Sequence, residues 1–288
     1  MRTPSASWGS ADMDPVASHY TVSGLLDRLD AALRLHGKDP AKVTVDDLAP
    51  LDEFHMRGRE ATEDLAALAG LESGDHVVDV GCGIGGSSRF LAARCGCRVT
   101  GIDLTPEFCS TAEALTRRTG LDGQIEYRCA SALAMPLADA SADVAWTQHA
   151  QMNIADKPGL YREIARIVKP GGRFAFHDIL AGPGGIPHFP VHWADYAELS
   201  HLVAPDDLRA LLERSGFRIL AWHDKTGVSV AWFKTTGKAA RDLPPDAPPP
   251  LGVQLLLGGD MSAKVANVTR NMEEGRITFH MGVAERLR

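Results

Sequence analysis

The sequence has no long apolar run and no excess of basic residues. Its 288 residues include 30 Lys and Arg against 37 Asp and Glu, which gives a formal net charge of −7. This negative charge argues against nucleic acid and anionic membranes as partners. No stretch approaches the ~20 apolar residues needed to span a bilayer, and the first residues lack the apolar region of a signal peptide. We therefore expect a cytoplasmic protein without a membrane partner.

The sequence also has few cysteines and no pair of them in CxxC spacing. An odd number without that spacing supports neither a disulfide scaffold nor a zinc site, so we expect no metal. The five cysteines are Cys82, Cys95, Cys97, Cys109 and Cys129. With 44% hydrophobic residues, the chain is long enough to bury one substantial core with additions.

Residues 77–105 carry the most informative pattern in the chain. A short apolar run of three valines predicts a buried parallel strand, and three closely spaced glycines then allow a turn that a ligand can approach closely. A second strand over 98–102 ends at Asp103, whose carboxylate can accept hydrogen bonds from both hydroxyls of an adenosine ribose. The pattern predicts a site for a nucleotide cofactor.

The glycines alone do not identify that cofactor. Gly81, Gly83 and Gly86 also fit the dinucleotide fingerprint, which is a weak motif by itself. Asp79 would lie beside the diphosphate of NAD as a like charge, whereas it could serve the cationic methionine end of S-adenosylmethionine. The alternative is that Asp79 only accepts hydrogen bonds from amides of the turn.

The order of motifs resembles the class I S-adenosylmethionine-dependent methyltransferases. Beyond the glycine turn, the similar stretches are 51–62, 147–157, 160–180 and 188–194. Together they look like the small-molecule enzymes related to sarcosine and dimethylglycine N-methyltransferases. The resemblance implies a Rossmann-like α/β fold with a mostly parallel seven-stranded sheet, an antiparallel last strand and helical additions at both ends. It also implies S-adenosyl-L-methionine as methyl donor, S-adenosyl-L-homocysteine as product and a small-molecule acceptor, with nitrogen favoured and oxygen or carbon open.

The resemblance assigns cofactor contacts residue by residue. At the position of Ser131 many relatives carry an Asp for the adenine amino group, so here either the Ser131 hydroxyl replaces it or Ser131 is only a turn residue. The implied cofactor residues are Asp79, Gly81, Gly83, Gly85, Asp103, Leu104, Ser131, Ala132, Gln148 and His55.

Acceptor contacts are expected beyond the carboxyl ends of the strands and in whatever covers them. His149 follows the fourth strand and is the candidate for orienting the acceptor or removing its proton, although such histidines are often structural. The loop over 182–203 is rich in aromatic and imidazole groups, which suit an acceptor pocket or a hydrophobic anchor. Tyr20 either helps to cover the site or belongs to a helix that shields the core. The candidate substrate residues are Tyr20, Asn153, Asp178, His188, His192 and Trp193.

The chain is expected to divide into a mobile start and helical cover (1–60), a core (61–238), and a Pro-rich linker with a helical segment (239–288). The short gap between strands expected at 217–222 and 228–234 predicts an antiparallel hairpin. The final segment is too small to fold alone, so it should dock on the core or on another subunit, which leaves a homodimer open.

Two other functions remain open at this point. An NAD-dependent oxidoreductase would also use a glycine turn, although Asp79 and an antiparallel sheet ending argue against it. A non-catalytic scaffold could retain the cofactor fold, because fold and motif do not prove turnover.

Overall fold

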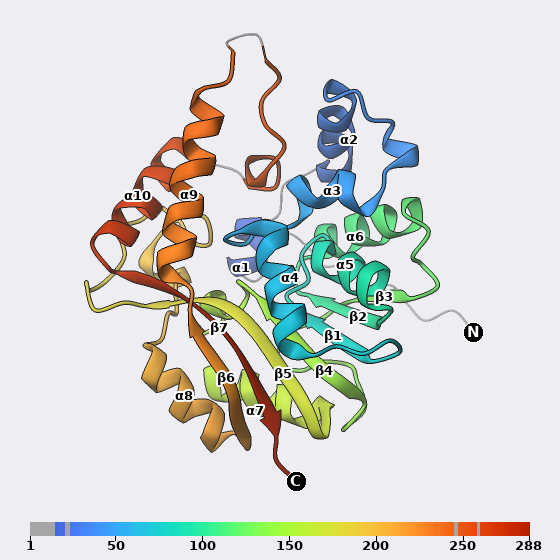
Figure 1. Ribbon diagram of the computed structural model, residues 1–288, viewed down its shortest axis with the longest axis vertical. Helices are drawn as coiled ribbons and strands as arrows, with labels where there is room; N and C mark the ends of the chain where they lie inside the picture. The colour runs from blue at the N-terminus through green and yellow to red at the C-terminus, as the bar shows by residue number, and fades with distance from the viewer. Residues whose placement is uncertain (1–14, 21–23, 245–246, 258–259) are drawn as a thin grey trace.

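The protein is built on one seven-stranded sheet with helices on both faces (Figure 1). The computed structural model describes residues 15–20, 24–244, 247–257 and 260–288. The strands lie in the order β3-β2-β1-β4-β5-β7-β6. Their bounds are β1 His76–Val80, β2 Arg98–Asp103, β3 Ile125–Cys129, β4 Ala142–Gln148, β5 Val168–Ala181, β6 Phe217–Asp224 and β7 Ile277–Arg286. The helices are α1 Pro15–Tyr20, α2 Leu25–Leu35, α3 Val45–Asp52, α4 Gly58–Ala69, α5 Gly86–Cys95, α6 Pro106–Arg118, α7 Lys157–Ile167, α8 Pro205–Arg214, α9 Thr226–Arg241 and α10 Met261–Glu273.

The pairing of the strands confirms the expected fold class. β1 to β5 pair in parallel, and β7 inserts antiparallel between β5 and β6. Since β1, β2 and β4 are parallel, their carboxyl ends meet at one edge of the sheet, where Asp79, Asp103 and Gln148 lie. Among the described residues, no helix has the length and apolar character required to cross a membrane.

Two apolar layers cover the sheet. On one face, α4 and α5 pack through residues such as Leu65 and Leu91 against Val77 and Trp146. On the other face, α7 and α8 form a core with Phe174 and Phe176 of β5. Both faces of β1 and β4 are therefore buried, which explains why these strands read as nearly continuous apolar runs.

The expected hairpin after residue 217 is wrong. Residues 228–234 lie inside α9, and the strand that pairs with β6 is β7, more than fifty residues further along. A short apolar run cannot distinguish a strand from a buried helix by periodicity. Here the helix packs Val230, Trp232 and Phe233 against the small core shared by α10 and β7.

The C-terminal segment was expected to be mainly helical, and this is wrong for its second half. The segment forms α10 and then β7, which pairs with β5 from Ala181 opposite Ile277 to Arg173 opposite Glu285. It therefore supplies a strand of the central sheet.

The N-terminal region consists of three helices. Residues 1–14, expected to be mobile, lie outside the described residues, while α1 ends at Tyr20 and α2 begins at Leu25. Leu29 and Leu33 of α2 pack with Leu48 of α3 and Phe108 of α6. This small core attaches the N-terminal helices beside the carboxyl edge of β2.

Candidate cofactor and acceptor site

The glycine turn between β1 and α5 is tightly enclosed. Gly81, Gly83 and Gly85 all have positive φ, at 77°, 54° and 83°. A Cβ at Gly81 would collide with the Ala150 side chain, and one at Gly83 would lie 2.9 Å from Cζ of Phe54. Only glycine meets both the backbone and the space requirements.

Asp103 joins the end of β2 to this turn. Its carboxylate accepts hydrogen bonds from the Gly83 and Thr105 amides, both at 2.9 Å. Burial raises the pKa of Asp103, and these amide bonds oppose the rise. Because a carboxylate offers about four lone-pair sites, Asp103 retains acceptor capacity for ribose hydroxyls.

Asp79 lies fully buried at the end of β1. It accepts a hydrogen bond from the Ser88 hydroxyl at 2.6 Å. Burial raises the pKa of Asp79 to about 7; the charge of Asp103 adds to the rise and Ser88 opposes it. A buried carboxylate with no cation on it within the described structure suits a cationic ligand.

Gln148 and His55 are linked through a hydroxyl that the sequence analysis did not single out. Thr62 Oγ1 lies 3.2 Å from Nε2 of His55 and 3.3 Å from Oε1 of Gln148, and it donates to Glu53 at 2.6 Å. The Gln148 oxygen also accepts from Ser87, while the Gln148 Nε2 is buried without a partner. An unpaired buried donor of this kind fits a ligand that brings an acceptor, such as a carboxylate.

A buried ion pair lies behind the glycine turn and was also missed. Arg89 of α5 donates to Asp52 of α3 at 2.5 Å, and both side chains are inaccessible to solvent. Arg89 also contacts Thr116, which lies 2.9 Å from the Tyr127 hydroxyl. The Asp52 backbone oxygen packs against Gly86 at the start of α5. The pair therefore attaches the N-terminal helices to the helix that begins at the cofactor turn.

The expected adenine side of the site includes Ser131, Ala132 and Leu104. The Ser131 hydroxyl accepts from the Leu133 amide at 3.2 Å, as a turn residue does. Ala132 packs on the sheet core, and Leu104 is partly exposed after β2. The Ser131 hydroxyl therefore takes part in a local turn. Its contact with the adenine amino group stays a prediction.

His149 follows β4 in a strained backbone conformation. Its φ is 51°, which is uncommon for a residue other than glycine and is often found at functional positions. The His149 amide donates to the His177 carbonyl at 2.9 Å. Burial, followed by the neighbouring histidines, lowers the pKa of His149 well below its usual range. The imidazole is therefore neutral at pH 7 and able to accept a proton.

Asp178, which is expected to contact the acceptor, accepts hydrogen bonds from both sides of this strained turn. Its carboxylate accepts from the Thr147 hydroxyl at 3.2 Å and from the Ala150 amide at 3.1 Å. Burial raises the pKa of Asp178 to about 7. Because Thr147 and Ala150 lie on either side of His149 in the chain, Asp178 helps to fix the position of His149.

Three of the candidate substrate residues form one network. The Tyr20 hydroxyl donates to Oδ1 of Asn153 at 3.0 Å, and the Asn153 amide donates to the carbonyls of Trp193 and Leu199. Burial raises the pKa of Tyr20. The structure thus brings the end of α1, the segment after β4 and the aromatic loop together.

Two histidines of the loop over 182–203, His188 and His192, are candidate substrate residues and have different surroundings. Nε2 of His188 lies 2.9 Å from Oε2 of Glu274. The His188 amide donates to Oδ1 of Asn271 and the His188 carbonyl accepts from Nδ2 of Asn271, so His188 faces α10. His192 has a buried Nε2 without a partner, and burial lowers its pKa to about 4. The Trp193 ring packs in the core of the loop, as an anchor would.

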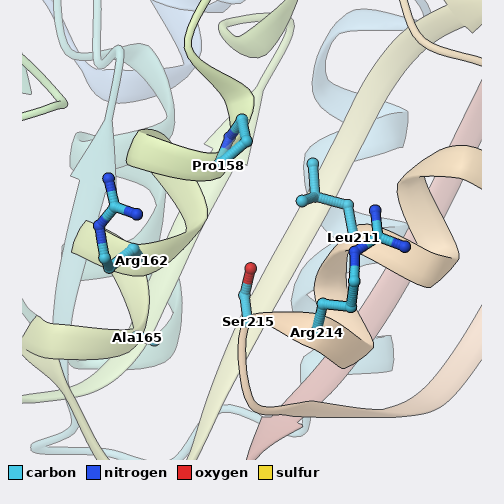
Figure 2. A pocket seen from close by; sticks show the side chains of 6 residues that line it. All are labelled: Pro158, Arg162, Ala165, Leu211, Arg214 and Ser215. Carbon is cyan, nitrogen blue, oxygen red and sulfur yellow. The ribbon is translucent and has the colours of Figure 1, made fainter.

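A pocket on the outer helices lies apart from these residues. Figure 2 shows it between α7 and α8, where Arg162 and Pro158 face Leu211 and Arg214. None of the residues that line it is a predicted site residue, so it does not contribute to the candidate site.

The family model and two relatives that match parts of this chain are all methyltransferases. Residues 78–176 match the model of the "Methyltransferase domain" family. An O-methyltransferase, cnsE, of Penicillium expansum is 28% identical over 277 residues, covering 93% of this chain and 90% of that protein. A dimethylglycine N-methyltransferase of Parasynechococcus marenigrum is 34% identical over 163 residues, covering 57% of this chain and 58% of that protein.

Solved structures agree on the fold. The geranyl diphosphate C-methyltransferase of Streptomyces coelicolor, in complex with Mg²⁺, geranyl diphosphate and S-adenosyl-L-homocysteine, superposes with a TM-score of 0.64 at 19% identity. The match covers 78% of this chain and 77% of that one. At this identity the likeness shows the fold alone, since function resides in the site.

Proposed function

We propose that the chain is a class I S-adenosylmethionine-dependent methyltransferase and that it transfers the methyl group to a nitrogen, oxygen or carbon of a small-molecule metabolite. The methyl donor, S-adenosyl-L-methionine, supplies an activated sulfonium. The protein's task is then to hold an acceptor in line with the methyl group and to exclude water, and orientation can supply roughly 7 to 11 kcal/mol.

One observation carries this proposal. Two buried carboxylates, Asp79 and Asp103, flank a glycine turn that admits no side chain, and His149 lies beyond the neighbouring strand. Asp103 would hold the ribose hydroxyls and Asp79 the cationic amino acid end of the donor, with the Gln148 amide free for a carboxylate. The diphosphate of NAD would lie beside the buried carboxylate of Asp79 as a like charge, which argues against the oxidoreductase.

Replacing Asp103 with Ala should weaken binding of S-adenosylmethionine by about 1 to 3 kcal/mol, because hydroxyl groups lose their acceptor. Isothermal titration calorimetry measures this, with a thermal melt to confirm folding, since the same carboxylate also accepts from the Gly83 amide. Asp122→Ala is the matched control, because Asp122 is an exposed acid without a side-chain hydrogen bond or ion pair to any described residue. Equal affinity of the Asp103 variant, or tight binding of NAD by the wild type, would sink the proposal.

Affinity for S-adenosylmethionine should fall as the pH drops below about 7. Burial raises the pKa of Asp79 to about 7, so the free protein carries a protonated acid below that pH, and a cationic ligand favours the ionised form. The loss should approach about tenfold per pH unit, as expected for one linked proton. Titrations between pH 7.5 and 5.5 test this. Asp79→Asn should bind weakly with a flatter profile, and a pH-independent wild type would contradict the assignment.

A further inference from the structure

Three histidines from separate segments gather beyond β4. We name His55, His149 and His177 the imidazole cluster. The ring centroids of His149 and His177 lie 4.9 Å apart, and His55 lies 6.0 Å from each. Within the part of the chain that the structure describes, no group of His, Cys, Asp or Glu side chains is arranged to hold a metal ion. The cluster therefore needs another explanation.

The polar atoms of the cluster are short of partners. His55 Nδ1, His149 Nε2 and both ring nitrogens of His177 are buried without a hydrogen bond. Each buried polar group left unpaired carries an uncompensated desolvation penalty, so several in one place indicate that a ligand group completes them. The Phe279 ring of β7 stacks on the His149 imidazole, with 6.1 Å between the ring centroids, and covers that face of the imidazole.

The cluster is uncharged, and the nearby cations are already paired. Burial lowers the pKa of His55 to about 4 and holds the pKa values of His149 and His177 well below their usual range. The other groups whose charges reach these rings are Arg57, Arg59, Asp64, Lys225 and His192.

Each of those cations has a carboxylate partner. Arg57 and Lys225 share Asp64 at 2.8 and 3.2 Å, and Arg59 pairs with Glu53. An acceptor with a phosphate or a carboxylate would find no unpaired cation among the described residues around the cluster. The carboxylate nearest to these rings is Glu53, 3.8 Å from Nε2 of His55, and it is already held by Arg59 and by the Thr62 hydroxyl, so it is not free for an ammonium group. The cluster thus suits an uncharged polar group.

We infer that the acceptor presents an un-ionised acidic hydroxyl, a phenol or an enol, to His149, and that His177 is a positioning residue for that imidazole. This inference rests on the proposed function. His177 lies on β5 opposite Gln148, and its carbonyl accepts a hydrogen bond from the His149 amide. Both the ring and the backbone of His177 therefore act on His149.

The reaction balances without another reactant. The hydroxyl proton passes to the His149 ring, and the acceptor oxygen forms a bond to the methyl carbon as the bond from that carbon to sulfur breaks. The electron pair of the broken bond stays on sulfur, which becomes the neutral thioether of S-adenosylhomocysteine. The products are a methyl ether and an imidazolium, which then loses its proton to water.

A panel of matched aromatic acceptors tests the acceptor class. Naphthalene and quinone-like ring systems carrying a hydroxyl, an amine or a carboxylate are incubated with the full chain and S-adenosylmethionine, and S-adenosylhomocysteine and methylated product are measured by mass spectrometry. We expect the hydroxyl compounds to turn over at least 100-fold faster than their amine and carboxylate counterparts. Faster turnover of amines or carboxylates, or no turnover of any hydroxyl compound, would overturn the inference. Methylation of an amine would still leave the proposed function intact.

A His177→Phe variant tests the positioning role, because it keeps the ring and removes both nitrogens. With a hydroxyl acceptor, kcat should fall at least tenfold while affinity for S-adenosylmethionine is unchanged. The acid limb of the kcat profile should also move to higher pH, because His177 is one of the groups that lower the pKa of His149. His177→Gln replaces it if the Phe variant fails to fold. A normal kcat with an unmoved acid limb in the folded variant would show that His177 is structural.

Discussion

Replacing His149 with Asn is expected to lower kcat by about 10²-fold or more, the usual contribution of a general base, while affinity for S-adenosylmethionine barely changes. Asn is the informative substitution because it tolerates the left-handed conformation that His149 adopts, with φ of 51°. The backbone can therefore stay in place while the proton acceptor is lost. Steady-state turnover of the unmethylated hydroxyl acceptor and calorimetry with the donor measure the two effects separately.

His223→Asn is the control for this experiment, since His223 is an exposed imidazole at the end of β6. It should keep wild-type turnover. In the wild type, kcat should stay level from pH 8 to about 6.5 and decline only below that, because the pKa of His149 is held well under its usual range by burial. Near-normal turnover in the His149 variant would mean that proximity alone drives the reaction and that this histidine is structural.

Replacing Asp52 with Asn is expected to reduce the free energy of unfolding by about 3 to 5 kcal/mol, because it leaves the Arg89 guanidinium buried without a counter-charge. The substitution preserves the size of the side chain, so packing contributes little to the loss. Denaturant unfolding monitored by circular dichroism measures the change.

The same two helices provide a matched control for this pair. Arg94 of α5 pairs with Asp46 of α3 at 2.7 Å, with both side chains more than half exposed. Arg94→Ala should change stability by only about 0 to 1 kcal/mol, since water screens exposed pairs. If both variants lose the same small amount, the buried pair does not hold the N-terminal helices to the cofactor turn.

The cofactor half of the site could be predicted from the sequence because it is local. Strand, glycine turn, helix and second strand follow one another within thirty residues, and parallel pairing places Asp79 and Asp103 at one sheet edge. Glycine adopts positive φ readily, so the backbone conformation at Gly81 and Gly83 agrees with the residue type at those positions. No long-range information was needed for these residues.

The rest depends on contacts between distant segments. Thr62 and His177 lie more than one hundred residues apart, yet Thr62 contacts Gln148 at the end of β4 and His177 contacts His149 directly after it. The roles of Asp178 and His188 likewise depend on their partners, which periodicity does not specify. The strand predicted over 228–234 is part of helix α9 for the same reason. Tertiary packing decides whether a short apolar run forms a strand or a helix.

Acceptor-dependent release of S-adenosylhomocysteine tests the central claim most directly. The full chain is incubated with isotopically labelled S-adenosylmethionine and a hydroxyl acceptor, with Asp103→Ala run in parallel. We predict labelled methyl on the acceptor, one S-adenosylhomocysteine released per methyl transferred, and slower transfer by the variant at donor concentrations that only partly saturate it. If the wild type binds the donor but methylates no hydroxyl, amine or carbon acceptor, the chain uses this fold for another purpose and is not a methyltransferase in function.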